Sequence, residues 1–374
     1  RLIPSSGIQM ALTLTNRDVE TSLTMARCIE VLEIAYRELG LGRATNIPRC
    51  DILSPMPQAG TYHALKTMSG SVPALGAAAV RLDSDLLRWP MIDGKRRRLK
   101  VAAVDSKLRI AKENGLVLVY HLATGEPVAL MQDGSIQRMR VAGTAALAAK
   151  VLSRPESSVL GIFGSGWQAR SQVEALLHVR PIKQIKVFSP NKEHRTDFAA
   201  WVREKFNKDC VAVDEPEGVV RSADIVLCIT NSMDPVFLEK WISPGLHISA
   251  GRNGEIEEGV ISRSDRVFLN WKEVAIPYPI GEKAREEIPE FTIGDYGRIL
   301  SQGALKWEEY PLLSDVVAGK VPGRKASSDV TCFLSNIGIG IQFAAAGWAA
   351  YEAARKQGIG AIIPDHWLLQ ETPL

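Results

Sequence analysis

A glycine-rich turn in the middle of the chain has the form of a dinucleotide-binding motif. The mostly apolar run Val159–Phe163 leads directly into Gly164-Ser165-Gly166-Trp167-Gln168-Ala169. In a G-x-G-x-x-A pattern the first glycine makes a tight turn, the second lets backbone N–H groups approach a pyrophosphate, and the alanine allows close helix–strand packing. The free N–H groups of the following helix then face the phosphates. We therefore predict that these six residues bind a cofactor.

The end of the next strand bears on which dinucleotide is bound. An NAD site usually places Asp or Glu there, to accept hydrogen bonds from the ribose 2′-OH. Here the chain instead offers Ser189, Asn191, Lys192 and Arg195 around the place of a 2′-phosphate. This favours NADP(H), with NAD(H) as the alternative. The plainer interpretation is that Lys192 and Arg195 belong to a solvated first helical turn.

Three basic residues outside this motif could act on a substrate. Lys66 lies in the strand-like run 61–67, where a buried ammonium group would need a partner and could lose proton affinity, and so serve as acid or base. Arg49 follows a proline, and Arg140 opens an alanine-rich helical pattern. Two guanidinium groups would suit a substrate carboxylate, because each donates two parallel hydrogen bonds. By residue type alone, Lys66 would more often be an exposed strand residue, and the two arginines could equally be surface charges.

The elements around the motif predict an α/β fold. Strand-like runs at 185–188, 225–229, 247–250 and 267–269, with a helical pattern over 195–206, give the β-α-β alternation that the motif requires. We expect residues 141–328 to form one doubly wound parallel sheet. The loop Thr230, Asn231 and Ser232 follows its fourth strand, where cofactor and substrate normally meet; it also fits a simple polar turn.

A long amphipathic helix is predicted near the amino terminus. Thr15 and Asn16 give a capping signal, apolar residues then recur at spacings of three and four, and Gly40 and Gly42 end the pattern. Residues 1–9 carry no function that their sequence indicates.

Composition is that of a two-domain globular protein. The chain has 374 residues, more than one core usually serves, and 46% of them are hydrophobic and 23% charged. No apolar run reaches the roughly 18 residues of a membrane span, and the amino terminus lacks a signal-peptide core, so we expect a cytoplasmic protein without a membrane partner. The five cysteines are widely spaced, which indicates buried free thiols rather than disulfides or a metal site.

A basic run, Lys95–Arg98, is the one feature that a nucleic-acid-binding protein would share. It is short and without flanking aromatic residues, and the net charge of the chain is only +3. Such a run is typical of a solvated loop, so we expect no nucleic-acid partner.

An ordered set of short motifs gives the chain a family resemblance that runs from about Leu14 to its end. The set comprises Pro48-Arg49, Tyr62-x-x-x-Lys66, Gly125-Glu126-Pro127 before Asp133-Gly134, Arg140-x-Ala142-x-x-x-Ala146-x-Ala148, Gly164-Ser165-Gly166-Trp167-Gln168-Ala169, Pro244-Gly245-x-His247-Ile248, Asn336–Gln342 and Ile363–Trp367. Together these resemble the ornithine cyclodeaminase and mu-crystallin family.

The resemblance implies a homodimer with a Rossmann domain (141–328) inserted into an α+β substrate and dimerisation domain (1–140 with 329–374). It implies that Arg49 and Arg140 bind the substrate carboxylate and that Lys66 lies beside the reacting C=N carbon. It also implies that Thr230, Asn231, Ser232 and Asn336 lie near the nicotinamide; Asn336 could instead cap the glycine-rich helix that follows it.

One departure separates the chain from the cyclodeaminases of that family. They place an Asp shortly after the strand that matches 247–250, and it acts in the imine and ring-closure steps. Here Asn253 or Gly254 takes that position, and Glu255 lies in an acidic stretch typical of a solvated loop. Reduction of a preformed iminium needs mainly positioning and charge.

The resemblance and this departure favour an NAD(P)H-dependent reductase of a cyclic α-imino acid such as pyrroline- or piperideine-2-carboxylate. The alternatives are an ornithine or lysine cyclodeaminase, an alanine or opine-type dehydrogenase, and, outside the enzymes, a protein that binds NADPH and a small ligand as mu-crystallin does.

Overall fold

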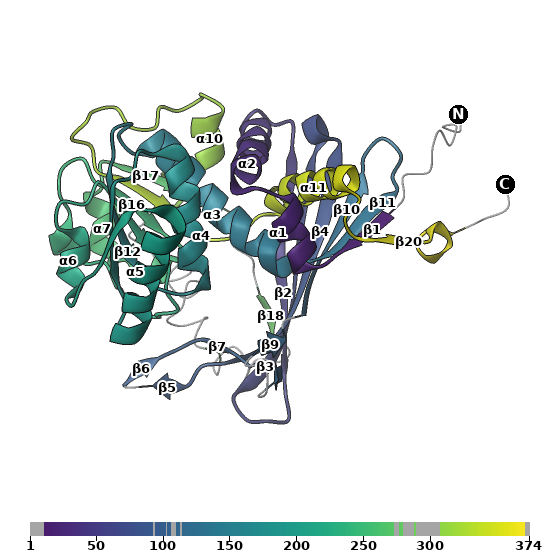
Figure 1. The fold of residues 1–374 in the computed structure, drawn as a ribbon, viewed down its shortest axis with the longest axis horizontal. Coiled ribbons are helices and arrows are strands. Elements are labelled where there is room, and N and C mark those ends of the chain that lie inside the picture. The colour runs from purple at the N-terminus through teal and green to yellow at the C-terminus, as the bar shows by residue number, and fades with distance from the viewer. Residues whose placement is uncertain are drawn as a thin grey trace.

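Two lobes, each built on its own sheet, are joined by the long helix α3 (Asp133–Leu152) in the computed structural model (Figure 1). The structure describes residues 11–92, 94–101, 103–105, 110–112, 114–272, 277–279, 288 and 307–370. Residues 1–9 lie outside this part of the chain, as do the side chains of Lys95, Arg96 and Asn253.

The first lobe holds the predicted doubly wound sheet, which is confirmed. Its strands are β12 (Val159–Phe163), β13 (Gln184–Phe188), β14 (Asp209–Ala212), β15 (Ile225–Cys228), β16 (His247–Ala250), β17 (Arg266–Leu269) and β19 (Thr331–Leu334). All pairs are parallel, in the order β14-β13-β12-β15-β16-β19-β17. The order reverses between β12 and β15, and this reversal opens a crevice at the carboxyl ends of both strands.

The helices of this lobe follow the strands in sequence. They are α4 (Trp167–Val179), α5 (Lys192–Phe206), α6 (Pro216–Val220), α7 (Glu258–Arg263) and α10 (Leu313–Val317), with the 3₁₀ turns η2 (Glu239–Trp241), η3 (Asn253–Glu255) and η5 (Trp307–Glu309). Helix α5 begins three residues before its expected start at Arg195, because the side chain of Asn191 accepts a hydrogen bond from the His194 N–H and caps it.

The second lobe is a mixed nine-stranded sheet in the order β18-β2-β3-β4-β10-β11-β1-β20, with β7 beside β4. Its strands are β1 (Ala11–Leu14), β2 (Thr45–Pro55), β3 (Thr61–Val72), β4 (Ala77–Arg88), β7 (Leu99–Lys100), β10 (Asn114–His121), β11 (Pro127–Gln132), β18 (Pro277–Pro279) and β20 (Ala361–Ile363). Helices α2 (Met25–Gly40) and α11 (Gly340–Gln357) pack on it (Figure 1). The turns η1 (Pro73–Leu75) and η6 (Asp365–Trp367) complete the lobe.

A narrow arm extends from this sheet beneath the first lobe (Figure 1). It contains the short hairpin β5 (Met91–Ile92) with β6 (Lys95–Arg96) and returns through β7. A second small hairpin, β8 (Ala103–Asp105) with β9 (Ile110–Lys112), follows.

Two helix predictions are corrected. The expected single amino-terminal helix is two, α1 (Asn16–Ser22) and α2, because the backbone is extended at Leu23 and the Thr24 side chain caps a new start. Thr15 does cap α1, through a capping box with Asp18. Arg140 does not open its helix but lies in the middle of α3.

The sheets also bear on where the domains divide. The expected boundary at residue 328 precedes β19, yet β19 pairs with β16 and β17 in the parallel sheet, and β18 pairs with β2 in the mixed sheet. We propose that the chain returns to the second lobe after β19. Within the described part of the chain, no helix combines the length and the apolar character that crossing a membrane requires.

Candidate active site

The glycine turn lies at the floor of a cavity of about 820 Å³ at the carboxyl edge of the parallel sheet. Gly164 has φ of 108°, and a Cβ there would lie 2.3 Å from the Ile229 carbonyl oxygen. At Gly166 a Cβ would meet nothing within 4 Å, which leaves the open approach that a pyrophosphate needs. Ala169 is fully buried beneath the turn. The shape and the donor set therefore fit a dinucleotide.

Predicted cofactor residues gather around this cavity, though not all of them. Those that line it are Gly164, Ser165, Gly166, Trp167, Gln168, Ser189, Asn191, Thr230, Asn231 and Ser232. Lys192 is exposed at the start of α5 and is not among the lining residues. Arg195 is buried; its guanidinium donates to the Ser189 and Pro190 carbonyls and to Asp214. Arg195 was predicted to lie beside the ribose. Its side chain is instead engaged in holding together the loop after β13.

The loop after β15 is held by a carboxyl group that was expected to be solvated. Glu255 is fully buried: its Oε1 accepts hydrogen bonds from the Thr230 N–H and hydroxyl, and its Oε2 accepts one from the Arg252 N–H at 3.0 Å. Burial raises the pKa of Glu255 to about 7, against the opposing effect of these donors. The expectation of a solvated Glu255, based on the acidic residues around it, is therefore wrong, because the turn η3 directs the Glu255 side chain inward.

A second, smaller cavity of about 320 Å³ contains the predicted substrate residues. Arg49, Lys66 and Arg140 all line it, although β2, β3 and α3 carry them. The sheet register puts Lys66 opposite Asp51 on one side and Asp83 on the other. Its ammonium donates to Asp83 at 3.1 Å and to Asp85.

The surroundings of Lys66 favour loss of its proton. Desolvation is the largest effect lowering the pKa of Lys66, and the positive charges of Arg98 and Arg49 lower it further; Asp83 and Asp85 act in the opposite direction. A buried lysine with this balance can exchange a proton with a bound ligand.

Each arginine owes its position to a local feature of the fold. The β2–β3 register shifts between Ile47 and Cys50, and this irregularity turns Arg49 toward the cavity, where it contacts Asp51 through two hydrogen bonds. Arg140 is buried, donates to Gln137 and, at 2.8 Å, to Gln342, and lies over the Phe343 ring. Desolvation lowers its pKa, to about 9. It therefore stays cationic at neutral pH.

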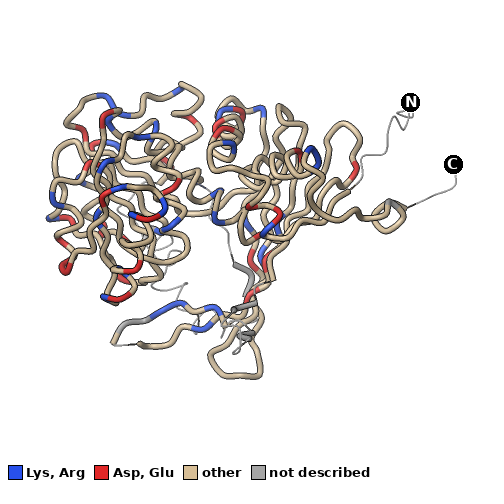
Figure 2. Tube along the Cα trace, in the orientation of Figure 1, with Lys and Arg blue, Asp and Glu red and all other residues tan. Residues whose placement is uncertain are grey.

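Several charged residues of this cavity escaped the sequence reasoning. Arg81 and Asp83 line it, and Arg81 pairs with Asp83 and with Asp133 of α3. A signal existed: Arg81, Asp83 and Asp85 alternate along β4, which puts three charges on one face of a strand. Figure 2 shows charged residues of both signs on the strands where the two lobes meet.

The two cavities meet. Trp167 and Gln168, from the first turn of α4, line both of them. The basic run that was expected to be a solvated loop is also part of this junction, since Arg97 lines the larger cavity and Arg98 the smaller. A ligand on the arginines and a dinucleotide on the glycine turn would therefore both lie beside the first turn of α4.

Comparison with known proteins identifies the family of the chain. Residues 107–358 match the model of the ornithine cyclodeaminase/mu-crystallin family. The chain belongs to this family. A Delta(1)-pyrroline-2-carboxylate reductase of Bacillus cereus is 28% identical over 70% of this chain and 78% of its own length. The ketimine reductase mu-crystallin of mouse is 25% identical over 66% of this chain and 72% of its own length.

A solved member of the family resembles the whole fold. The Delta(1)-pyrroline-2-carboxylate reductase of Thermococcus litoralis, in complex with NADH and L-proline, superimposes with a TM-score of 0.76 at 25% identity, over 94% of this chain and all of that one. An archaeal alanine dehydrogenase dimer with bound NAD has a TM-score of 0.73 at 22% identity, which supports the fold alone, over 95% of this chain and 99% of that one. As a family member with a dinucleotide cavity, the chain is an NAD(P)-dependent oxidoreductase.

One described position that the family resemblance singled out lies apart from these cavities. Asn336 lines neither: its carboxamide accepts hydrogen bonds from the Asn270 and Trp271 N–H groups and donates to the Trp271 carbonyl. It joins the ends of β17 and β19 instead of capping a helix. Asn253 begins η3, and its side chain lies outside the described part of the structure, so its place at the substrate stays a prediction.

Proposed function

We propose that the protein reduces the C=N bond of an α-imino acid, a cyclic ketimine carboxylate such as pyrroline- or piperideine-2-carboxylate. The observation that carries this proposal is that Trp167 and Gln168 line both the dinucleotide cavity and the cavity lined by Arg49, Lys66 and Arg140. Direct hydride transfer needs the two reacting carbons in contact.

Different residues of the smaller cavity would bind the substrate carboxylate and donate the proton. When bound, the reduced nicotinamide supplies the hydride. Arg49 and Arg140 hold the substrate carboxylate, since both are fixed by neighbours that leave them facing the cavity. Lys66, whose pKa is lowered by burial, donates the proton to the imine nitrogen and then regains one from solvent, while Asp83 and Asp85 hold its amino group in place.

Reduction is favoured over cyclodeamination by the loop after β16. Among the described residues of this loop, none lines the smaller cavity, and the carboxyl group of Glu255 is engaged by Thr230. The acid that ring closure would require is therefore missing from the expected place.

The cofactor that we propose is NADP(H) in preference to NAD(H). The end of β13 carries Ser189 and Asn191 in place of a carboxylate, and Lys192 and His194 stand at the start of α5 beside them. Arg195 contributes indirectly, by fixing the loop. A ratio of kcat/KM values for NADPH and NADH below one would contradict this preference.

We further propose a homodimer formed through the face of the mixed sheet opposite Lys66. That face exposes Ile52, Leu82 and Leu116, and Leu82 and Leu116 are direct partners across β4 and β10. Large side chains about 40% exposed in neighbouring strands are typical of a covered surface. Light scattering should give twice the chain mass, and Leu82→Glu should halve it.

The test of the proposed activity is NADPH and NADH oxidation by the purified protein with pyrroline-2-carboxylate and piperideine-2-carboxylate. Rapid oxidation is the expected result. Proline formed from L-ornithine without net cofactor change would identify a cyclodeaminase instead. Oxidation with pyruvate and ammonia or methylamine alone would indicate an alanine or opine-type dehydrogenase. NADPH binding without turnover on any of these would leave a ligand-binding protein.

A further inference from the structure

A chain of buried hydrogen bonds runs from Arg140, in the wall of the substrate cavity, to the parallel sheet of the first lobe. The Arg140 guanidinium donates to Gln342 Oε1 at 2.8 Å, and Gln342 Nε2 donates to the Tyr36 hydroxyl at 2.7 Å. Tyr36 donates to Asn270 Oδ1, and Asn270 Nδ2 donates to the Ile337 carbonyl. Asn270 directly follows β17, so the chain ends at the carboxyl edge of that sheet.

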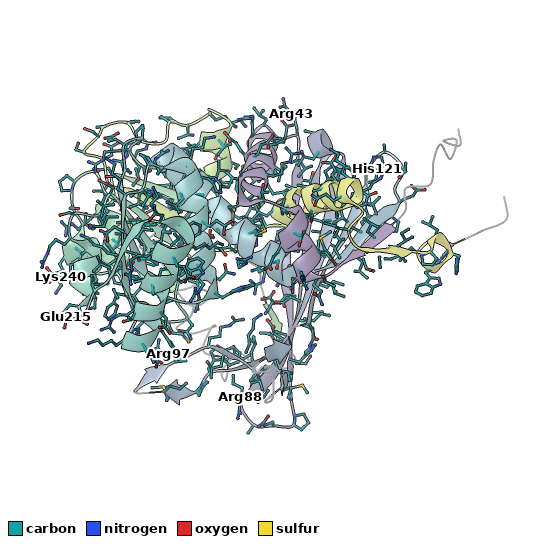
Figure 3. The ribbon with its side chains drawn as sticks, viewed as in Figure 1. Arg43, Arg88, Arg97, His121, Glu215 and Lys240 are labelled. Carbon is teal, nitrogen blue, oxygen red and sulfur yellow. The ribbon has the colours of Figure 1, made fainter. Side chains whose placement is uncertain are left out.

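The links lie where α2, α3 and α11 pack against one another. Tyr36, Gln342 and Asn270 are all fully buried. Tyr36 faces the interior, whereas Arg43, beyond the end of the same helix, stands at the outer edge of the molecule (Figure 3). A polar group that lost its partner here could not bond to bulk water instead, and leaving it unpaired is costly. Burial therefore favours keeping every link made.

The chemistry at the two ends fixes the direction of the chain. A guanidinium only donates and a carbonyl only accepts, so Gln342 turns its oxygen to the first and Asn270 turns its NH₂ group to the second. The Ile339 N–H also donates to Gln342 Oε1, at 3.0 Å. Burial raises the pKa of Tyr36 to about 12, so its hydroxyl keeps the proton that it donates. Neither amide can flip without bringing two donors or two acceptors face to face.

The backbone between β19 and α11 closes this chain into a ring. The Asn336 carboxamide accepts a hydrogen bond from the Asn270 N–H at 3.2 Å, and the Asn270 side chain binds Ile337, so both contacts hold this segment to β17. A Cβ at Gly338 would lie 2.5 Å from Arg140 Nη1 and 2.8 Å from Nη2. The segment therefore lies directly against the guanidinium, and Asn270 reaches Arg140 from two sides.

Two glutamines determine which edge of Arg140 faces the cavity. Its Nε and Nη2 donate to Gln137 Oε1, at 3.1 and 2.7 Å, and its Nη1 donates to Gln342. Each terminal nitrogen of a guanidinium carries a second N–H, and a carboxylate can bridge such a pair through two parallel hydrogen bonds. Rotation of the guanidinium away from the glutamines would move this pair.

We propose that Gln342 and Tyr36 are positioning residues, which hold Arg140 in the orientation that binds the substrate carboxylate and tie that orientation to β17 of the first lobe. This rests on the proposed imine reduction. Neither residue is among those that line the substrate cavity. They take no part in hydride or proton transfer and act on the substrate through Arg140 alone.

The test removes one hydroxyl group. Tyr36→Phe deletes the middle link and keeps the ring. KM should rise by about three- to tenfold for whichever of pyrroline- and piperideine-2-carboxylate the wild type reduces faster, because Arg140 loses its fixed orientation. KM for NADPH should stay as in the wild type. Unfolding cannot imitate this result, since a smaller folded fraction lowers the apparent kcat and leaves KM unchanged. An unchanged imine KM would overturn the proposal.

The matched control is Tyr351→Phe. Tyr351 is buried on α11, the helix of Gln342, and its ring packs against Trp348. The same hydroxyl is thus removed from the same core without touching the chain, and both KM values should stay as in the wild type. An equal rise of the imine KM in both tyrosine variants would count against a specific role of Tyr36.

Arg140→Leu supplies the background that separates positioning from packing. Once the guanidinium is absent, Tyr36→Phe should raise the imine KM no further, because two residues that act through one contact are not additive. If Tyr36→Phe does not fold, Gln342→Glu makes the same comparison, since its carboxylate would pair with Arg140 and raise the imine KM by neutralising it. Additive effects would overturn this inference alone. A wild-type protein that reduces neither imine would overturn the proposed function, and this inference with it.

Discussion

The two cavities of this site are built on different physical principles. The dinucleotide cavity is shaped by backbone, with a left-handed glycine, an uncrowded second glycine and the amino terminus of α4. The substrate cavity is shaped by a network of buried charges that reaches across β2, β3, β4 and α3. The first should therefore be sensitive to an added methyl group and the second to a removed charge.

Removing the ammonium group of Lys66 should have the largest effect on activity. Lys66→Ala takes away the proposed proton donor, so kcat with the preferred imine should fall by roughly 10²–10⁴-fold. Dinucleotide binding, followed by quenching of tryptophan fluorescence, should stay within about threefold of the wild type, since Lys66 lines only the smaller cavity. Near-normal turnover in this variant would remove Lys66 from the mechanism.

The glycine turn offers the converse experiment. Gly164→Ala puts a Cβ 2.3 Å from the Ile229 carbonyl at φ of 108°, so it should cost about 1–3 kcal/mol of stability and abolish dinucleotide binding. Gly166→Ala is the matched control, because its Cβ meets no protein atom within 4 Å. It should keep the wild-type melting temperature and lose only dinucleotide affinity. An equal fall in melting temperature in both variants would contradict the different roles assigned to Gly164 and Gly166.

Arg140→Leu should act on substrate binding first. Loss of a charge-assisted hydrogen bond to the carboxylate should raise KM for the imine by about 10–100-fold. Gln137 and Gln342 lose a partner as well, so a modest fall in melting temperature is expected. An unchanged KM would exclude Arg140 from carboxylate binding.

Protonation of Glu255, which holds the cofactor loop, should make the stability of the protein depend on pH. The pKa of Glu255 in the folded protein, about 7, lies above the usual 4.5. Between these two pH values the folded state binds more protons than the unfolded state. The contribution of this group to the free energy of unfolding is therefore lost as pH rises. His247, whose pKa is lowered to about 3 by burial, acts in the opposite sense over part of that range. The difference in melting temperature between the wild type and Glu255→Gln isolates the carboxyl group. From pH 5 to 8 the melting temperature of Glu255→Gln should rise relative to that of the wild type. Parallel curves of melting temperature against pH would contradict the assignment.

The difference between a cavity shaped by one local turn and a cavity shaped by charges from distant elements explains what the sequence could predict. The nucleotide motif is local, so the turn of Gly164 and Gly166, which lines the larger cavity, could be predicted from six consecutive residues. Arg49, Lys66 and Arg140 could be named as candidates from their chemistry, but only the family resemblance placed them at one site, because nothing in their spacing says that β2, β3 and α3 converge. Asp83, Asp133 and Arg98 were missed, since their roles depend on strand register and on the course of the arm. Glu255 was misjudged because burial in a 3₁₀ turn leaves no periodic signal.

The most direct test of the central claim is to follow the hydride. NADPH carrying deuterium at C4, on the transferred face, should deliver it to the α-carbon of proline formed from pyrroline-2-carboxylate, or to the α-carbon of the amine formed from the preferred imine. Stoichiometric transfer of deuterium to that carbon is the predicted result, because the two cavities meet at Trp167 and Gln168. Product that forms without deuterium at the α-carbon, or deuterium that appears in solvent, would contradict a shared site for dinucleotide and imine.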